Sequence, residues 1–142
     1  METIVWKPIP VKDIKAKITT TGRCPYNAKQ WYFLYSPFRK GEIKSANESV
    51  NIAMHELLHM MLHYYYEDYI LAQWLTKEQF HDLKEAQTVI LNEEYDGLFT
   101  ETDKWYELHK YLREKFADFW KHNKNFDAFV DYGIKLVKET AI

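Results

Sequence analysis

The sequence predicts an α+β fold, in which a small three-stranded antiparallel sheet is followed by about four helices. Two observations lead to this prediction. Residues 1–40 contain short segments that are rich in β-branched and aromatic residues or alternate between apolar and polar residues. From residue 45 to residue 142, apolar residues recur at helical spacing behind helix-capping residues. The whole chain, 1–142, is short enough to form a single domain.

Three segments of the first part are predicted to be strands, at residues 2–6, 14–19 and 31–35. In the second of them, Ile14, Ala16 and Ile18 alternate with polar residues, which is the period of a half-buried strand. Turn-forming residues lie between the second and third segments, namely Gly22, Pro25 and Asn27. An antiparallel meander is the simplest arrangement of three such strands.

The first predicted helix covers residues 48–69, and either Ser45 or Asn47 can cap it. Its apolar residues follow the helical period: Val50, Met54, Leu57, Leu58, Met61 and Leu62. A second helix is predicted at residues 77–95, because Thr76 and Gln79 form a capping box and Gly97 suits its exit. Two further helices are predicted at residues 103–120 and 126–137.

Composition excludes several classes of protein. Hydrophobic residues make up 46% of the chain, which is enough for a substantial core. With 19 basic and 21 acidic residues, the chain has no positive excess, so we expect no binding to nucleic acid. A single cysteine, Cys24, excludes an intramolecular disulfide. Since the sequence has neither a signal-peptide pattern nor a long apolar run, we expect a cytoplasmic protein that does not enter membranes. The sequence indicates no particular oligomeric state.

Residues 55–59 read His-Glu-Leu-Leu-His, inside the first predicted helix. Side chains four residues apart differ by only about 40° around a helix, so His55 and His59 face one point and can share a metal ion. Glu56 is rotated by about 100° from His55 and should stand beside the metal rather than bind it. That position suits a general base.

The third metal ligand must come from elsewhere. His63 lies about 12 Å from His55 along the helix axis, so we expect it to pack or form hydrogen bonds near the site. On the second predicted helix, Glu85 lies on a polar stripe with His81, Thr88 and Asn92 that carries no other definite charge. Glu85 is therefore the preferred ligand, with Glu93 and then Glu78 as alternatives.

These motifs resemble those of the HExxH zinc peptidases of the gluzincin kind. HELLHMMLH at 55–63 and KEAQTVIL at 84–91 are similar to the corresponding segments of the ImmA/IrrE-type peptidases. An alternative match of LNEEYD at 91–96 to thermolysin-like gluzincins would make Glu93 the ligand. Very small stand-alone gluzincins also exist. The resemblance implies a zincin-like fold, a zinc cofactor and a substrate-binding edge strand before the active-site helix, here at residues 31–36.

The sequence thus predicts a zinc-dependent endopeptidase that acts on a peptide or protein substrate. His55, His59 and Glu85 would hold the ion, and Glu56 would take a proton from zinc-bound water and pass it to the leaving amine. Two alternatives remain open. One is a zinc-binding protein that docks a partner without turnover, and the other is a latent peptidase whose own C-terminal segment, residues 137–142, blocks the cleft.

Overall fold

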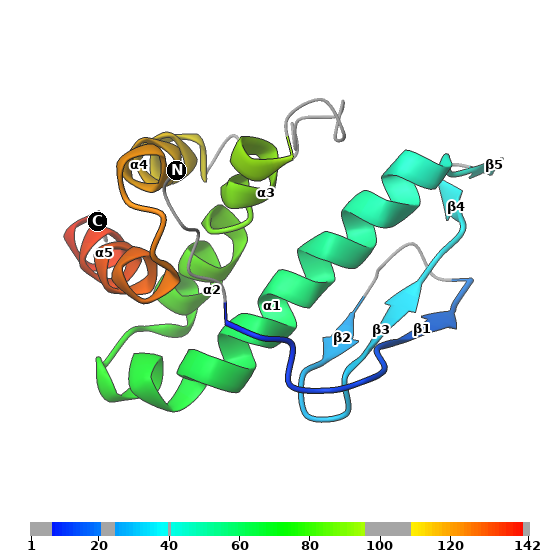
Figure 1. Cartoon of the computed structure of the whole chain (residues 1–142), viewed down its shortest axis with the longest axis horizontal. Helices are drawn as coiled ribbons and strands as arrows, with labels where there is room; N and C mark the ends of the chain where they lie inside the picture. The colour runs from blue at the N-terminus through cyan, green and yellow to red at the C-terminus, as the bar shows by residue number, and fades with distance from the viewer. Residues whose placement is uncertain (1–6, 21–24, 40, 96–108, 141–142) are drawn as a thin grey trace.

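The computed structural model of the chain describes residues 7–20, 25–39, 41–95 and 109–140. In these residues a long helix separates a small sheet from the remaining helices, which confirms the α+β class (Figure 1). The strands are β1 (Lys15–Ile18), β2 (Tyr26–Asn27), β3 (Tyr32–Tyr35), β4 (Phe38–Arg39) and β5 (Glu42–Ile43). The helices are α1 (Ala46–Ala72), α2 (Lys77–Ala86), α3 (Val89–Glu94), α4 (Lys110–His122) and α5 (Phe126–Glu139).

The three-stranded sheet is mixed, so the prediction of an antiparallel meander is wrong. Its strand order is β1-β3-β2, with β3 parallel to β1 and antiparallel to β2. Along the chain, β1, β2 and β3 alternate in direction, as they would in a meander. In the sheet, however, β3 is inserted between β1 and β2, and it therefore pairs with β1, which has the same direction. Strand β2 has only two residues, which is too short to show the apolar–polar alternation of a strand. The sequence did not predict it. The predicted strand at residues 2–6 lies outside the described residues.

A second, two-stranded sheet is formed by β4 and β5, which pair antiparallel. It was not predicted either. Gly41 stands between the two strands with a φ of +88°, a left-handed conformation that glycine adopts without strain.

Helix α1 begins at the predicted cap. Ser45 accepts a hydrogen bond from the backbone of Glu48, and the Glu48 side chain accepts one from the backbone of Ser45. The helix is buried on both sides around residues 58–62, because it packs against the sheet on one side and the helices on the other. Met60 and Met61 contact Trp31 and Phe33 of the sheet side, whereas Leu58 and Leu62 belong to the helical core. Helix α1 therefore holds a fixed position between two cores.

The predicted helix at 77–95 is divided into α2 and α3. It starts as expected, with a capping box between Thr76 and Gln79. It is interrupted after Ala86, where the backbone amides of Thr88 and Ile90 donate to carbonyls three residues back instead of four. At this point the Thr88 hydroxyl donates to the Glu85 carbonyl at 2.7 Å and accepts from the Arg113 guanidinium at 2.9 Å. Such bonds between side chains and backbone compete with the regular helical pattern.

Helices α4 and α5 cover α2 and α3. Phe116 and Trp120 of α4 pack on Phe129 of α5, and all three are fully buried. Helix α4 begins at Lys110, and residues 103–108 of the predicted third helix, like Gly97, lie outside the described residues. Helix α5 starts after Asn125, whose side chain caps it, and ends two residues later than predicted, at Glu139 instead of 137. Among the described helices, none combines the length and the apolar character needed to cross a membrane.

The close packing around Gly133 in this core gives a stability prediction. A Cβ atom at Gly133 of α5 would lie 2.5 Å from Leu83 Cδ1 and 2.6 Å from two ring carbons of Phe116. We expect Gly133→Ala to destabilise the protein by about 1–3 kcal/mol through overpacking, although Gly→Ala inside an unhindered helix stabilises by about 1 kcal/mol. Urea denaturation measures the difference. Lys135→Ala, on the exposed side of α5, serves as the control. A Gly133→Ala variant more stable than wild type would contradict the packing described here.

Candidate metal centre

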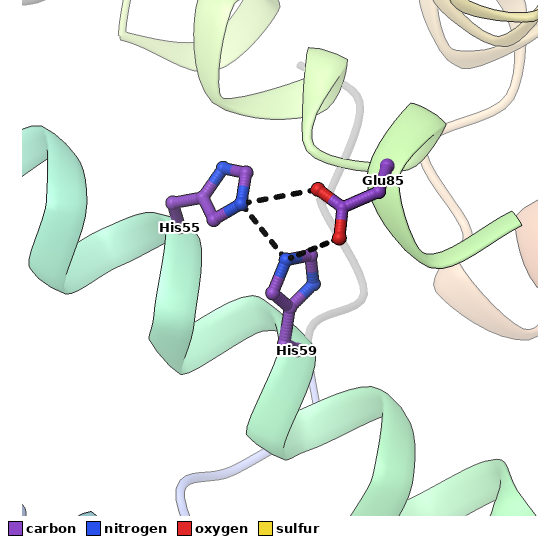
Figure 2. Close-up of side chains that lie close together, drawn as sticks. All are labelled: His55, His59 and Glu85. Atoms are coloured by element: carbon purple, nitrogen blue, oxygen red, sulfur yellow. Dashed lines mark hydrogen bonds and ion pairs between the residues drawn. The ribbon is translucent and has the colours of Figure 1, made fainter. Parts of the chain in front are cut away.

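Helix α1 presents His55 and His59 on one face, one turn apart. Their Nε2 atoms lie 2.8 Å from each other, and their ring centroids are 4.3 Å apart (Figure 2). His59 is buried at 2% exposure, while His55 is partly accessible. The predicted convergence of these two imidazoles is therefore present in the structure.

Helix α2 brings Glu85 to the same point. Its carboxylate faces both imidazoles, with Oε2 3.4 Å from Nε2 of His55 and Oε1 3.5 Å from Nε2 of His59 (Figure 2). Ligand atoms of the three side chains all lie within 4.8 Å of one another, and the group could hold a metal ion. Whether it does so stays a prediction.

The surroundings of these donors fit a metal ion. Oε2 of Glu85 is buried and has no hydrogen-bond partner among the described residues, which is costly unless a cation occupies the space beside it. Bonds of about 2.0–2.1 Å in a tetrahedral site would separate the donor atoms by about 3.4 Å. Oε2 of Glu85 lies at this distance from Nε2 of His55, whereas the Nε2 atoms of the two histidines lie closer together, at 2.8 Å. Zinc binds to donor sets of two imidazoles and one carboxylate, and other divalent transition metals bind to the same donor set.

Burial of His59 and the neighbours of Glu85 favour the protonation states that a metal ion requires. Desolvation lowers the pKa of His59 to about 3, so its imidazole is neutral at pH 7. Burial alone would raise the pKa of Glu85, but its polar contacts with His55 and His59 and the charge of Lys84 bring the pKa below its usual range. The structure thus offers a neutral imidazole and an ionised carboxylate, the forms that bind metal.

Glu56 also belongs to α1, and its side chain is buried at 9% exposure. Burial raises its pKa to about 7, and the negative charge of Glu85 adds to the rise, whereas His55 and Lys84 oppose it. Glu56 is not one of the three grouped donors. A buried carboxyl group beside the donors, with a pKa near neutrality, suits proton transfer.

The alternative carboxylates are engaged elsewhere. Glu93 forms an ion pair with Lys121 at 3.5 Å. Glu94 contacts Lys124 and accepts a hydrogen bond from the Trp120 indole at 2.6 Å. Glu78 is exposed in the first turn of α2. Of the acidic residues considered from the sequence, Glu85 is the one that the fold places beside the two histidines.

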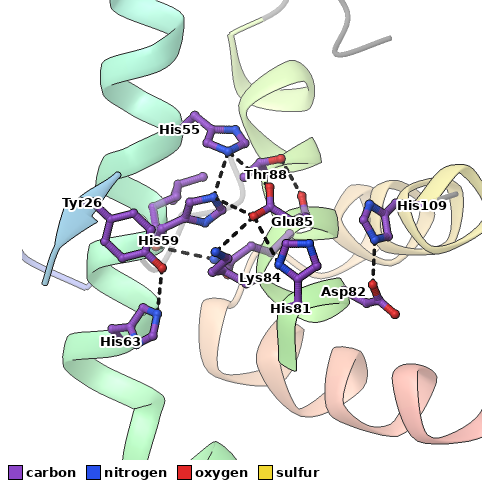
Figure 3. A network of polar contacts seen from close by, with 12 residues as sticks. Tyr26, His55, His59, His63, His81, Asp82, Lys84, Glu85, Thr88 and His109 are labelled. Atoms are coloured by element: carbon purple, nitrogen blue, oxygen red, sulfur yellow. Dashed lines mark hydrogen bonds and ion pairs between the residues drawn. The ribbon is translucent and has the colours of Figure 1, made fainter. Parts of the chain in front are cut away.

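His63 lies near the site without joining the three donors. Its Nε2 atom is hydrogen-bonded to the Tyr26 hydroxyl at 2.8 Å (Figure 3). Its Nδ1 atom lies 3.3 Å from Glu67. This agrees with the expectation that His63 packs or forms hydrogen bonds near the site. The Tyr26 ring also packs on His59, at 5.4 Å between ring centroids, so β2 forms one wall of the centre.

The predicted role of residues 31–36 as a substrate-binding edge strand is wrong in one respect. Strand β3 is the central strand of its sheet, since β1 and β2 pair on its two sides. The strand next to the candidate metal centre is β2, through Tyr26. Tyr66 is buried in the core and Tyr64 is exposed, and Cys24 lies outside the described residues.

Two contacts of the site escaped the sequence analysis. The ammonium group of Lys84 lies 3.1 Å from Oε1 of Glu85, and Tyr26 contacts His59 from the sheet (Figure 3). Of the polar stripe, His81 lies 3.8 Å from the Glu85 carboxylate through Nδ1, whereas Thr88 donates to the backbone carbonyl of Glu85. Only the adjacency of Lys84 to Glu85 could have been noticed in the sequence, and adjacency in a helix does not indicate contact.

No protein-family model, curated protein or solved structure matches this chain. Its function is therefore inferred from its own side chains.

Proposed function

We propose that this protein is a zinc-dependent endopeptidase of the zincin type, with His55, His59 and Glu85 as metal ligands and Glu56 as general base. One observation carries the proposal: two helices direct three side chains that could hold a metal ion to one point, and the buried carboxyl group of Glu56, whose raised pKa responds to the charges of His55 and Glu85, accompanies them. The helical spacing of His55 and His59 and the packing of Glu85 of α2 against them both support this choice of ligands.

The side chains divide the chemistry between them. When bound, zinc supplies Lewis acidity, which polarises a substrate carbonyl and makes water a stronger acid at neutral pH. Glu56, with a pKa of about 7, is partly ionised at neutral pH and can accept a proton from the attacking water. The protonated Glu56 then donates to the leaving amine. His59 and Glu85 are buried, so they keep their orientation throughout.

Cleavage of a broad mixture of unfolded polypeptides tests the proposal. The wild-type protein should generate new peptide termini when loaded with zinc, lose this activity with a chelator and regain it when zinc is restored. Mass spectrometry of the products detects the termini. If one zinc is bound per chain and no peptide bond is cleaved, the protein is a zinc-binding protein without turnover, and the proposed activity is wrong.

A C-terminal truncation addresses the latent alternative. Val137 is buried in the helical core, where its carbonyl accepts a hydrogen bond from Gln79 at 3.3 Å, and α2 lies between α5 and α1 in Figure 1. We therefore expect removal of residues 140–142 to leave the peptidase rate unchanged. Activity that appeared only after this truncation would instead support a peptidase blocked by its own C-terminus.

A further inference from the structure

The two carboxylate oxygens of Glu85 have different surroundings. Oε1 lies 3.1 Å from the Lys84 ammonium, 3.5 Å from Nε2 of His59 and 3.8 Å from Nδ1 of His81. Oε2 is buried without a hydrogen bond to any described residue and lies 3.4 Å from Nε2 of His55. Oε1 is thus paired with a protein cation, whereas Oε2 has the His55 imidazole beside it and no hydrogen bond from a described residue.

The position of Lys84 is itself supported. Its side chain is largely covered, at 18% exposure, and its ammonium lies 5.3 Å from the centre of the Tyr26 ring. A cation over an aromatic face is attracted to it, more strongly when water is excluded. The Tyr26 hydroxyl is in turn fixed by the hydrogen bond with His63. Figure 3 shows this connected set, which leads from β2 through Lys84 to the Glu85 carboxylate.

We propose that Lys84 is a positioning residue that holds Oε1 of Glu85, so that Glu85 binds the metal ion through Oε2 alone. This inference rests on the proposed metal centre and deepens it. A carboxylate that binds through both oxygens would take two coordination positions. With Oε1 held by Lys84, the three side chains take three positions and leave one open, which is the arrangement of catalytic zinc sites.

Cobalt substitution tests this assignment without depending on activity. Four-coordinate Co²⁺ absorbs visible light several-fold more strongly than five-coordinate Co²⁺. We expect the Co²⁺-loaded wild-type protein and Lys84→Arg to show the strong absorption. Lys84→Met frees Oε1 while keeping most of the side-chain volume, so its Co²⁺ absorption should be several-fold weaker. Lys84→Ala is measured in parallel, in case the Met variant does not fold. Its Co²⁺ absorption should also be several-fold weaker than that of the wild-type protein.

Lys121→Met is the matched control, because Lys121 pairs with Glu93 away from the centre, and its spectrum should equal that of wild type. Lys84 variants that are folded by circular dichroism and retain the wild-type spectrum would overturn the positioning role, even if they were less stable without metal. A wild-type protein that takes up no cobalt and no zinc would overturn the metal centre itself, and with it this inference.

Discussion

Glu56→Gln is expected to remove most peptide hydrolysis while leaving the metal and the fold in place. The glutamine amide has nearly the shape of the carboxyl group but cannot accept the proton of the attacking water. Loss of a general base typically lowers the rate by about 10²–10⁴-fold. Since Glu56 is buried and lies outside the three grouped donors, the metal content should stay that of wild type.

The measurement is kcat/KM on one peptide that the wild-type protein cleaves, with zinc content determined on the same samples. Glu93→Gln is the matched control, because it makes the same chemical change at a residue that pairs with Lys121. Its kcat/KM should be that of wild type. If Glu56→Gln released the zinc, Glu56 would be a ligand and the proposed division of roles would be wrong.

Glu85→Ala should cause the largest loss of metal affinity among the carboxylate variants. It removes one of three donors, so the loss should exceed the about 10–100-fold that outer partners of a metal site contribute. The variant should also lose most of the stabilisation that zinc gives the wild-type protein, because metal binding and folding are linked. Competition with a coloured zinc chelator measures the affinity, and thermal melts with and without zinc measure the stabilisation.

Glu78→Ala and Glu93→Ala are the controls for this experiment. Both residues were alternatives on sequence grounds, and both lie apart from the two histidines in the structure. Their zinc affinities should be close to that of wild type. If Glu93→Ala lost the metal and Glu85→Ala kept it, the match to thermolysin-like gluzincins would be the correct one and the placement of α2 against α1 would be wrong.

The features that could be predicted from the sequence are governed by local geometry. Ser45 and Thr76 start α1 and α2 because a capping box involves only four consecutive residues. His55 and His59 converge because helical spacing alone brings them together. Glu85 was chosen because it is the one definite charge on a polar stripe of the second predicted helix, and in the structure its carboxylate lies beside His55 and His59.

Features that depend on contacts between distant segments could not be predicted in this way. The strand order β1-β3-β2 follows from pairing between residues 15–18 and 32–35, for which a single sequence gives no signal. At the break after Ala86, Thr88 accepts a hydrogen bond from Arg113, which is 25 residues away in the chain. Tyr26 reaches His59 and Lys84 only because the sheet packs on α1. The contacts that surround the candidate metal centre are therefore properties of the tertiary structure.

The most direct test of the central claim is the metal content of the purified protein, measured by inductively coupled plasma mass spectrometry after mild zinc reconstitution. The His55–His59–Glu85 centre predicts one zinc per chain for the wild-type protein. It predicts a ratio near zero for a His59→Ala variant that is folded by circular dichroism, because His59 is both a donor and buried at the centre. A ratio near zero for the wild-type protein, or an unchanged ratio for His59→Ala, would contradict the account.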